Sequence, residues 1–199
     1  MESYDMIILN VAEESFAKNG FANTKLLELA KQANVNHALI HYYYRTKDKL
    51  YESVVERLFE KWEQQIKTFE WVGDDPTAVL TDYIERYFRF YVENVNFHKI
   101  RIWDVMEKKN LFAKYTEKFW KKDLEEKDRV FQMWKDKKMI RPQANGRLLL
   151  YSLWAQIQYF YSMDEENLQL IFNNKEGLDK NRKLLVERIA ETVVQQVVI

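Results

Sequence analysis

Thr24-Lys-Leu-Leu-Glu-Leu-Ala-Lys-Gln-Ala-Asn-Val-Asn-His-Ala-Leu-Ile-His-Tyr-Tyr-Tyr-Arg-Thr-Lys-Asp-Lys-Leu50 is the stretch that decides the fold of this chain. Its first part predicts a short amphipathic helix, because leucine and alanine recur at helical spacing from Leu26 to Ala33. A tight turn follows, and Asn34 tolerates the positive φ that such a turn requires. Asn36 is a good N-cap for a second short helix. This layout is typical of a helix-turn-helix, whose second helix fits the major groove of DNA.

The second helix has an inner and an outer face. We expect Ile40, Tyr43 and Tyr44 to face inward at helical spacing. Thr46 is placed to cap the next helix, and Asp48 falls in its first turn, where the helix dipole favours an anion. The side chains left for the outer face are Asn36, His37, Leu39, His41 and Tyr42.

The segment from Ile8 to Val55 resembles the N-terminal domain of TetR-family transcriptional regulators. The resemblance runs without a gap over about a quarter of the chain. Asn34 and Ala38 stand where the family has glycine, and His41 and Tyr44 stand where it has Tyr and Phe. The matching residues are Ile8, Leu9, Ala12, Phe16, Gly20, Phe21, Thr24, Leu29, Ala30, Ala33, Val35, Asn36, Ile40, Tyr43, Tyr44, Thr46, Lys47, Asp48 and Leu50.

The resemblance implies an all-α fold with two parts. Residues 1–50 would form a three-helix helix-turn-helix domain, and residues 51–199 would form a larger helical domain for effector binding and dimerisation. A helix over residues 46–70 would bridge them. The implied function is that of a bacterial, cytoplasmic, ligand-responsive repressor, not an enzyme, which binds a palindromic operator as a homodimer.

Composition agrees with a helical chain and bounds its partners. The 199 residues include no cysteine, two prolines and four glycines, so disulfides and thiolate metal sites are excluded and breaks in helices are few. The formal net charge is zero, but residues 31–49 carry four Lys or Arg against one Asp, a local net charge of +3. A basic edge of this size is sufficient for phosphate contacts. The longest uncharged stretch, 148–163, is too short to span a membrane.

Periodicity predicts further helices along the whole chain. Asp75 followed by Pro76 indicates an N-cap and a first helical residue, and Ser162 to Glu165 matches a capping box. Residues 99–138 carry 13 Lys or Arg against 8 Asp or Glu, which we interpret as a solvated helix face. The predicted helices cover residues 4–19, 24–31, 36–43, 46–68, 76–95, 98–108, 111–138, 144–161, a short segment after 165, and 179–197.

The helix over 144–161 is apolar on nearly every side, so it needs cover on every side. One subunit covers one side, and we expect a second copy to cover the other. The last helix, 179–197, adds Leu184, Leu185, Ile189, Val193 and Val197. Two such helices from each subunit would form a four-helix bundle, as in TetR-like dimers.

The candidate DNA contacts lie on and beside the second helix. We expect His37, Leu39 and His41 near bases or sugars, with Asn36 and Tyr42 close by. Phosphates would be held by Thr24, Lys25 and Lys47, two of which are helped by helix N-termini. The alternative is that Thr24, Asn36 and Thr46 are helix caps only, and one geometry can serve both roles.

A ligand pocket is expected in the second domain, which is crowded with aromatic residues. Large aromatics with a few polar tips suit a small apolar or aromatic effector, although most of them will form the core. The candidate pocket residues are Tyr87, Tyr91, Trp103, Met106, Trp134, Trp154 and Gln158.

The histidines offer little for other classes of function. His37 and His41 have a spacing that can bind a metal, but no third ligand follows at a recognisable spacing. His98 is isolated, and we expect it at a surface or a helix start. No metal or cofactor is therefore predicted. The alternatives left open are an all-α carrier or enzyme that does not bind DNA, and a nonspecific DNA-coating protein of the same fold.

Overall fold

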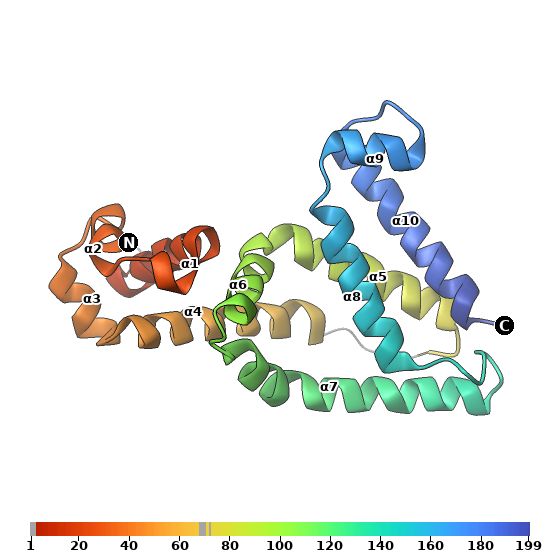
Figure 1. The fold of residues 1–199 in the computed structure, drawn as a ribbon. Helices are drawn as coiled ribbons and strands as arrows, with labels where there is room; N and C mark the ends of the chain where they lie inside the picture. The colour runs from red at the N-terminus through yellow and green to blue at the C-terminus, as the bar shows by residue number, and fades with distance from the viewer. Residues whose placement is uncertain (1–2, 68–70, 72) are drawn as a thin grey trace. The chain divides into compact units, whose positions relative to one another are not determined.

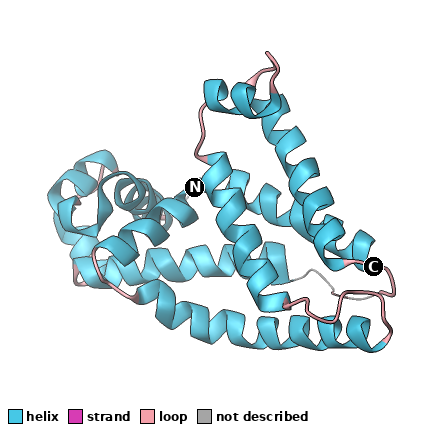
Figure 2. Ribbon diagram, turned by 45° about the vertical axis from the view of Figure 1, so that its right-hand side comes forward, coloured by secondary structure: helices cyan, strands magenta, loops and turns pink. Residues whose placement is uncertain are grey.

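The computed structural model describes residues 3–67, 71 and 73–199, and the regular elements of these residues are all helical (Figures 1 and 2). The predicted all-α class is confirmed. In this part of the chain the elements are α1 (Tyr4–Asn23), α2 (Leu26–Gln32), α3 (His37–Tyr44), α4 (Lys47–Trp62), η1 (Glu63–Lys67), α5 (Pro76–Glu93), α6 (Val95–Met106), α7 (Leu111–Asp136), α8 (Gly146–Tyr161), α9 (Glu165–Phe172) and α10 (Leu178–Val197).

The helix expected to bridge 46–70 is divided. It begins as α4 and continues as one π-helical stretch, η1, to Lys67. The rest of the prediction, at 68–70, and residue 72 of the turn expected before Pro76 lie outside the described residues.

Local chemistry sets several helix ends as predicted. Asn34 adopts a φ of 51°, and the Oδ1 of Asn36 accepts a hydrogen bond from Ala38 N at 2.9 Å. Thr46 Oγ1 accepts one from Lys49 N at 3.2 Å. The capping box at Ser162 is wrong. Asp164 caps α9 instead, because its carboxylate accepts from Asn167 N at 2.9 Å, whereas the Ser162 hydroxyl donates back to the Tyr159 carbonyl.

The helices pack into two compact units, of which the first contains Met1–Gln64 and Asn94–Trp120. In this unit α1 packs against α4 and α6, and α2 and α3 pack against each other and their neighbours. The buried Asp104 on α6 accepts hydrogen bonds from Leu111 N at 3.2 Å and Phe112 N at 3.1 Å, so it caps the start of α7. The core includes Ile8, Phe16, Ile40, Leu50, Tyr51, Val54, Leu58 and Phe59.

His98 also belongs to this core, which corrects the expectation of a surface position. Its side chain lies on α6 with only 3% of the residue exposed, and its ring contacts Phe97 edge to face at 5.2 Å. Burial, and then the charge of Arg101, lowers the pKa of His98 from 6.5 to about 3. The imidazole is therefore neutral in the folded chain.

The second unit contains Gln65–Glu93 and Lys121–Ile199. In it α10 packs against α5, α8 and α9, and α5 also packs against α8. Of the five α10 residues expected at a dimer interface, Leu185, Ile189, Val193 and Val197 are buried within the chain itself, and Leu184 is half-buried. The large apolar residues that α8 leaves exposed are Leu148, Tyr151 and Tyr159.

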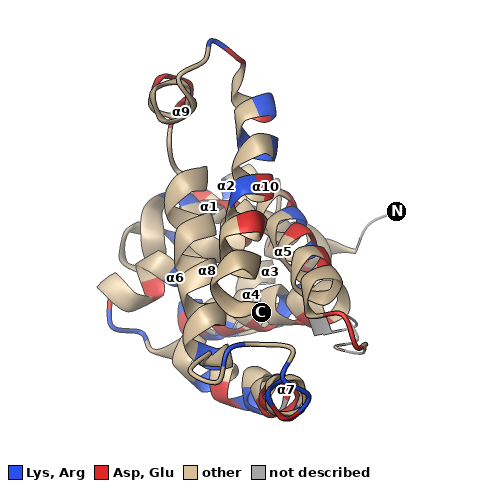
Figure 3. Cartoon of the chain, turned by 90° about the vertical axis from the view of Figure 1, so that its right-hand side faces the viewer, with Lys and Arg blue, Asp and Glu red and all other residues tan. Residues whose placement is uncertain are grey.

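Many charged residues of segment 99–138 are exposed, as predicted, but Asp104, Asp123 and Lys127 are buried, so the prediction of a solvated face is wrong at these three positions. Figure 3, which looks nearly down the axis of α7, shows both acidic and basic residues on this helix. Three lysines in the first unit pair with the acidic side of α4: Lys109–Asp48 at 2.7 Å, Lys114–Glu52 at 3.0 Å and Lys118–Glu56 at 3.7 Å. Among the described helices, none is both long enough and apolar enough to cross a bilayer.

Candidate DNA-binding surface

The helix-turn-helix is closed by its own backbone. The Val35 N–H donates to the Ala30 carbonyl at 3.0 Å and the Asn34 N–H donates to Lys31 at 3.1 Å, so the turn after α2 is tight. Ile40 and Tyr44 then anchor α3, with 1% and 7% of each residue exposed. The turn and these two anchors fix which face of α3 is outermost.

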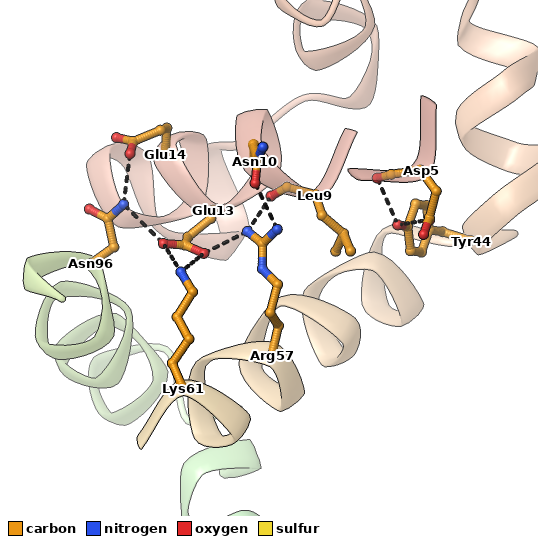
Figure 4. Close-up of polar contacts among 9 residues, drawn as sticks. All are labelled: Asp5, Leu9, Asn10, Glu13, Glu14, Tyr44, Arg57, Lys61 and Asn96. Carbon is orange, nitrogen blue, oxygen red and sulfur yellow. Dashed lines mark hydrogen bonds and ion pairs between the residues drawn. The ribbon is translucent and has the colours of Figure 1, made fainter. Parts of the chain in front are cut away.

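Tyr44 ties α3 to α1. Its hydroxyl contacts the carboxylate of Asp5 and lies 3.3 Å from the Asp5 carbonyl (Figure 4). Burial first, and then Asp5, raises the pKa of Tyr44, so the phenol stays protonated and donates. Tyr44 is similar in shape to the phenylalanine that the resemblance implies at this position, and its hydroxyl also bonds to α1.

The outer face of α3 is presented as predicted, with one correction. Asn36, His41 and Tyr42 are exposed, and His37 and Leu39 are half-buried. Tyr43 was expected inside, but 41% of it is exposed. It lies next to Tyr42, with ring centroids 5.3 Å apart, so the C-terminal end of α3 presents two tyrosines to the solvent.

The two histidines of α3 are held in contact. Their ring centroids lie 4.6 Å apart, edge to face. The Nδ1 of His41 lies 2.9 Å from the Arg45 carbonyl oxygen. A carbonyl can only accept, so this contact assigns the hydrogen to Nδ1 and leaves Nε2 as an acceptor in the neutral ring. Among the described residues, no group of three or more metal-ligating side chains is arranged to hold an ion.

Thr24 does not offer its side chain to a phosphate. The residue is 3% exposed, and its hydroxyl donates to the Gly20 carbonyl at 2.7 Å. Its N–H donates to Phe21 at 3.3 Å. Thr24 therefore caps the C-terminal end of α1. This is the helix-cap role that the sequence offered as the alternative to phosphate binding. Lys25, in contrast, has a side chain that is 75% exposed at the start of α2.

Lys47 lies at the N-terminus of α4 and is partly engaged. Its Nζ donates to the carbonyls of Thr24 at 2.7 Å and Ala22 at 3.2 Å, and it lies 4.4 Å from the centroid of the Phe21 ring. Burial is the largest effect on Lys47 and lowers its pKa. An ammonium group has three donors, so one remains for a phosphate oxygen.

Sequence reasoning missed the contacts that hold α1 at its kink. Gly20 has a φ of 74°, and Glu107 accepts hydrogen bonds from the next two backbone N–H groups, Phe21 at 2.8 Å and Ala22 at 3.0 Å. Trp103 Nε1 donates to the Ala17 carbonyl at 3.2 Å. These partners are more than 80 positions apart in the sequence, so no local signal could reveal them.

A second missed feature is the polar junction of α1, α4 and α6 (Figure 4). Glu13 is 8% exposed, and its carboxylate binds Arg57 at 2.6 Å and Lys61 at 3.2 Å. Asn96 of α6 donates to Glu13 at 3.3 Å and to Glu14 at 2.8 Å. A buried carboxylate with two cationic partners fixes the orientation of α1 on α4.

The predicted pocket residues do not all lie together. Trp103 packs on α1, and Met106 is 67% exposed, so neither position indicates a pocket. In the second unit, Tyr87 stacks with Trp154 at 5.7 Å. Tyr91 contacts Tyr161 at 4.9 Å.

The remaining two candidates differ in environment. Trp134 is fully buried and donates to the Gly73 carbonyl at 3.1 Å, whereas Gln158 is half-buried. Trp134 is therefore held by the fold, and its indole N–H is already used.

A buried ion pair beside the rings of Trp71 and Tyr83 was not predicted. Lys127 and Asp123 of α7 are 1% and 5% exposed and contact each other. The Lys127 ammonium lies 5.5 Å from the ring centroids of both Trp71 and Tyr83. Burial lowers the pKa of Lys127, and Asp123 opposes that effect. Sequence alone could not separate these residues from the many exposed charges of α7.

Comparison with known proteins agrees with this geometry. Residues 8–54 match the bacterial regulatory proteins of the tetR family, and residues 55–198 match the C-terminal region of YcdC-like proteins. The transcriptional repressor NicS of Pseudomonas putida is 28% identical over 90 residues, which is 45% of this chain and 42% of NicS. The transcriptional regulator RutR of Escherichia coli K12 is 23% identical over 77% of this chain and 71% of RutR.

A solved structure of AibR, in complex with isovaleryl coenzyme A and operator DNA, has the same fold. Its TM-score is 0.67, with 15% identity over 97% of both chains. The two family matches together cover almost the whole sequence. The chain therefore belongs to the tetR family of bacterial regulatory proteins, which are DNA-binding transcriptional regulators and not enzymes.

Proposed function

We propose that this chain is a repressor that binds a palindromic operator as a homodimer and is released by a small molecule. The observation that carries the proposal is the outer face of α3, where His41 and Tyr42 are exposed and His37 is half-buried on a helix anchored by Ile40 and Tyr44. The family match over residues 8–54 supports it. Residues 1–50 would act as the DNA-binding domain and residues 51–199 as the effector and dimerisation domain.

In this proposal α3 lies in the major groove. His37, Leu39 and His41 approach base edges or sugars, and Asn36 and Tyr42 lie at the margins of that contact. Leu39 offers only an apolar contact, for which a thymine methyl group is the matching partner. Lys25, Lys47 and the N-terminus of α4 hold phosphates. Thr24 supports them by closing α1, since its hydroxyl is already used.

In the proposed homodimer, the two copies of α3 lie on one face of the DNA. The exposed Leu148, Tyr151 and Tyr159 of α8 form an apolar stripe that a second copy would cover. We propose that α8 supplies the apolar part of this interface and that α10, within 179–197, contributes mainly polar contacts. A two-fold axis then predicts a palindrome with half-sites about 34 Å apart, or a multiple of that spacing.

The effector would bind in the second unit. Tyr83, Tyr87 and Trp154 form an aromatic cluster there, with the Trp154 indole donating to the Tyr83 hydroxyl at 3.0 Å. The Lys127–Asp123 pair adds polar atoms to an otherwise apolar surrounding. A mostly apolar site with few polar groups suits a small apolar or aromatic molecule. Binding of DNA implies a cytoplasmic location, where the bacterial chromosome lies.

The experiment is operator binding by variants of the proposed DNA face. DNA selected by the purified chain from a random pool serves as the operator. His41→Ala is expected to cost about 1–3 kcal/mol on that DNA, and much less on random DNA. Lys47→Ala is expected to weaken binding to both and to reduce the salt slope by about one.

Lys137→Ala is the matched control, since this lysine follows α7 in the second unit, lies outside α8 and α10, and has 47% of its side chain exposed. It should leave binding unchanged. If neither His41→Ala nor Lys47→Ala weakens binding, the assigned face is wrong. Equal affinity of the wild type for selected and random DNA would instead favour a nonspecific DNA-coating protein.

A further inference from the structure

The loop between α6 and α7 has a constrained shape. Lys108 and Asn110 adopt positive φ angles of 55° and 59°, and the Lys109 N–H between them donates to the Asp104 carbonyl at 3.0 Å. Residues other than glycine adopt such angles uncommonly. Glu107, which precedes them, is bound to the backbone of α1. The loop is thus built onto the helix-turn-helix, and its conformation directs the side chain of Lys109.

Lys109 reaches the N-terminus of α4. Its Nζ lies 2.7 Å from Asp48 Oδ1 and 3.6 Å from the centroid of the Phe21 ring. The Nζ of Lys47 lies 4.4 Å from the same centroid. Two ammonium groups therefore share one aromatic ring, which attracts cations through its face. All of these residues belong to the first unit.

The charges at this point bear directly on phosphate binding. Asp48 follows Lys47 in the sequence, and its side chain is 70% exposed. A DNA phosphate bound at Lys47 would therefore meet a carboxylate next to it. Lys47 and Asp48 sum to zero, and Glu107, whose charge also acts on Lys47, brings the local sum to −1, which Lys109 returns to zero.

We propose that Lys109 belongs to the DNA phosphate-binding edge, together with Lys47 and the N-terminus of α4. It lies outside the helix-turn-helix in the sequence and acts by offsetting the charge of Asp48. The partner is the sugar–phosphate backbone, so the contribution is independent of DNA sequence. The inference rests on the proposed function, because it assigns a further residue to the same surface.

Four variants test it, because affinity should follow the charge of the Lys109–Asp48 pair. Lys109→Ala leaves −1 and should weaken binding to operator and random DNA alike, by roughly fivefold, the scale of one exposed charge interaction. Its salt slope should fall by about one. Asp48→Asn leaves +1 and should tighten binding. The double variant restores zero and should bind like the wild type, as should Lys109→Arg.

The contrary outcome is equally sharp. If Lys109 only holds α4 in position through its ion pair with Asp48, then both single variants and the double variant lose DNA affinity together. The salt slope is then unchanged. That pattern, or no effect in any variant, overturns the inference. Wild type that fails to prefer any selected DNA would instead count against the proposed function itself.

The matched control uses the pair Lys118–Glu56, which joins α7 to α4 at 3.7 Å, whereas Lys109 lies in the loop before α7. Glu56 lies two turns along α4 from Asp48, about 12 Å at the rise of an α-helix. This exceeds the distance over which exposed charges act at physiological salt, about 8 Å. Lys118→Ala and Glu56→Gln should therefore leave DNA affinity within experimental error.

Discussion

At the scale of single residues, Gly20 lies at a position of the first unit that has no room for a side chain. Its φ of 74° disfavours any side chain, and a Cβ there would lie 2.6 Å from Glu107 Oε1 and 2.8 Å from the Trp103 ring. Both obstacles are packed against α1 and bonded to it. Glycine at this position lets α6 approach the backbone of α1 closely.

Gly20→Ala is therefore expected to destabilise the fold by about 2 kcal/mol or more, through backbone strain and displacement of Glu107. Urea unfolding measures the change. Gly177→Ala is the control, because Gly177 has a negative φ and nothing within 4 Å of a Cβ. A loss below about 0.5 kcal/mol at Gly20 would mean that the kink relaxes freely.

The burial of His98 predicts how the stability of the fold depends on pH. Its pKa is near 6.5 in an unfolded chain and about 3 in the folded one. Below pH 6.5 the unfolded state binds a proton that the native state does not, so stability falls as pH falls towards 3. The loss is about 1.4 kcal/mol per pH unit, and above pH 6.5 this contribution is constant.

The measurement is urea unfolding of wild type and His98→Gln at pH 7, 6 and 5. The difference in unfolding free energy between the two should shrink as pH falls, since the variant lacks the titrating group. His37→Gln, on the solvated side of α3, serves as the control. Parallel pH curves for wild type and His98→Gln would show that His98 accepts a proton in the native state.

At the scale of elements, the short-range chemistry of the sequence was a good guide. Asn34, Asn36, Thr46 and Asp75 took the turn and cap positions expected of them, because those roles depend on backbone groups two or three residues away. The same rule gave the wrong cap at Ser162, where Asp164 is a stronger acceptor that is two residues closer to α9.

Contacts between elements could not be predicted in the same way. Glu13 with Arg57, and Glu107 with Phe21, join residues 44 and 86 positions apart. In the sequence, Glu13 and Glu107 cannot be distinguished from acidic residues that lie exposed on a helix. The buried Lys127 was hidden for the same reason, within a helix of many charges. The outer face of α3 was predictable, because its pattern lies in one continuous segment.

The α8 helix carries a prediction about assembly. Leu148→Lys places a charge on the exposed apolar stripe and should dissociate the proposed homodimer, because a charge buried in an interface costs more than it gains without a partner. Sedimentation velocity measures the mass. Leu27→Lys, at an exposed leucine of α2 that is 58% accessible, is the control. A Leu148→Lys protein that stays dimeric would place the interface elsewhere.

At the scale of the whole molecule, a chain with a net charge of zero belongs to a family that binds a polyanion. The basic residues proposed to contact phosphates are few and local: Lys25, Lys47 and Lys109. Each subunit should therefore neutralise few phosphates, and the salt dependence should be modest. Specificity must then come from α3 and from the spacing of two copies.

The most direct measurement is selection of DNA from a random pool, followed by hydroxyl-radical footprinting on the selected sequence. We predict an inverted repeat whose half-sites are centred about 10 base pairs apart, or a multiple of that, with both half-sites protected. His41→Ala should lose the preference for that repeat. Enrichment of no sequence, or of a single unpaired site, would contradict the proposal that two copies of α3 read adjacent turns of DNA.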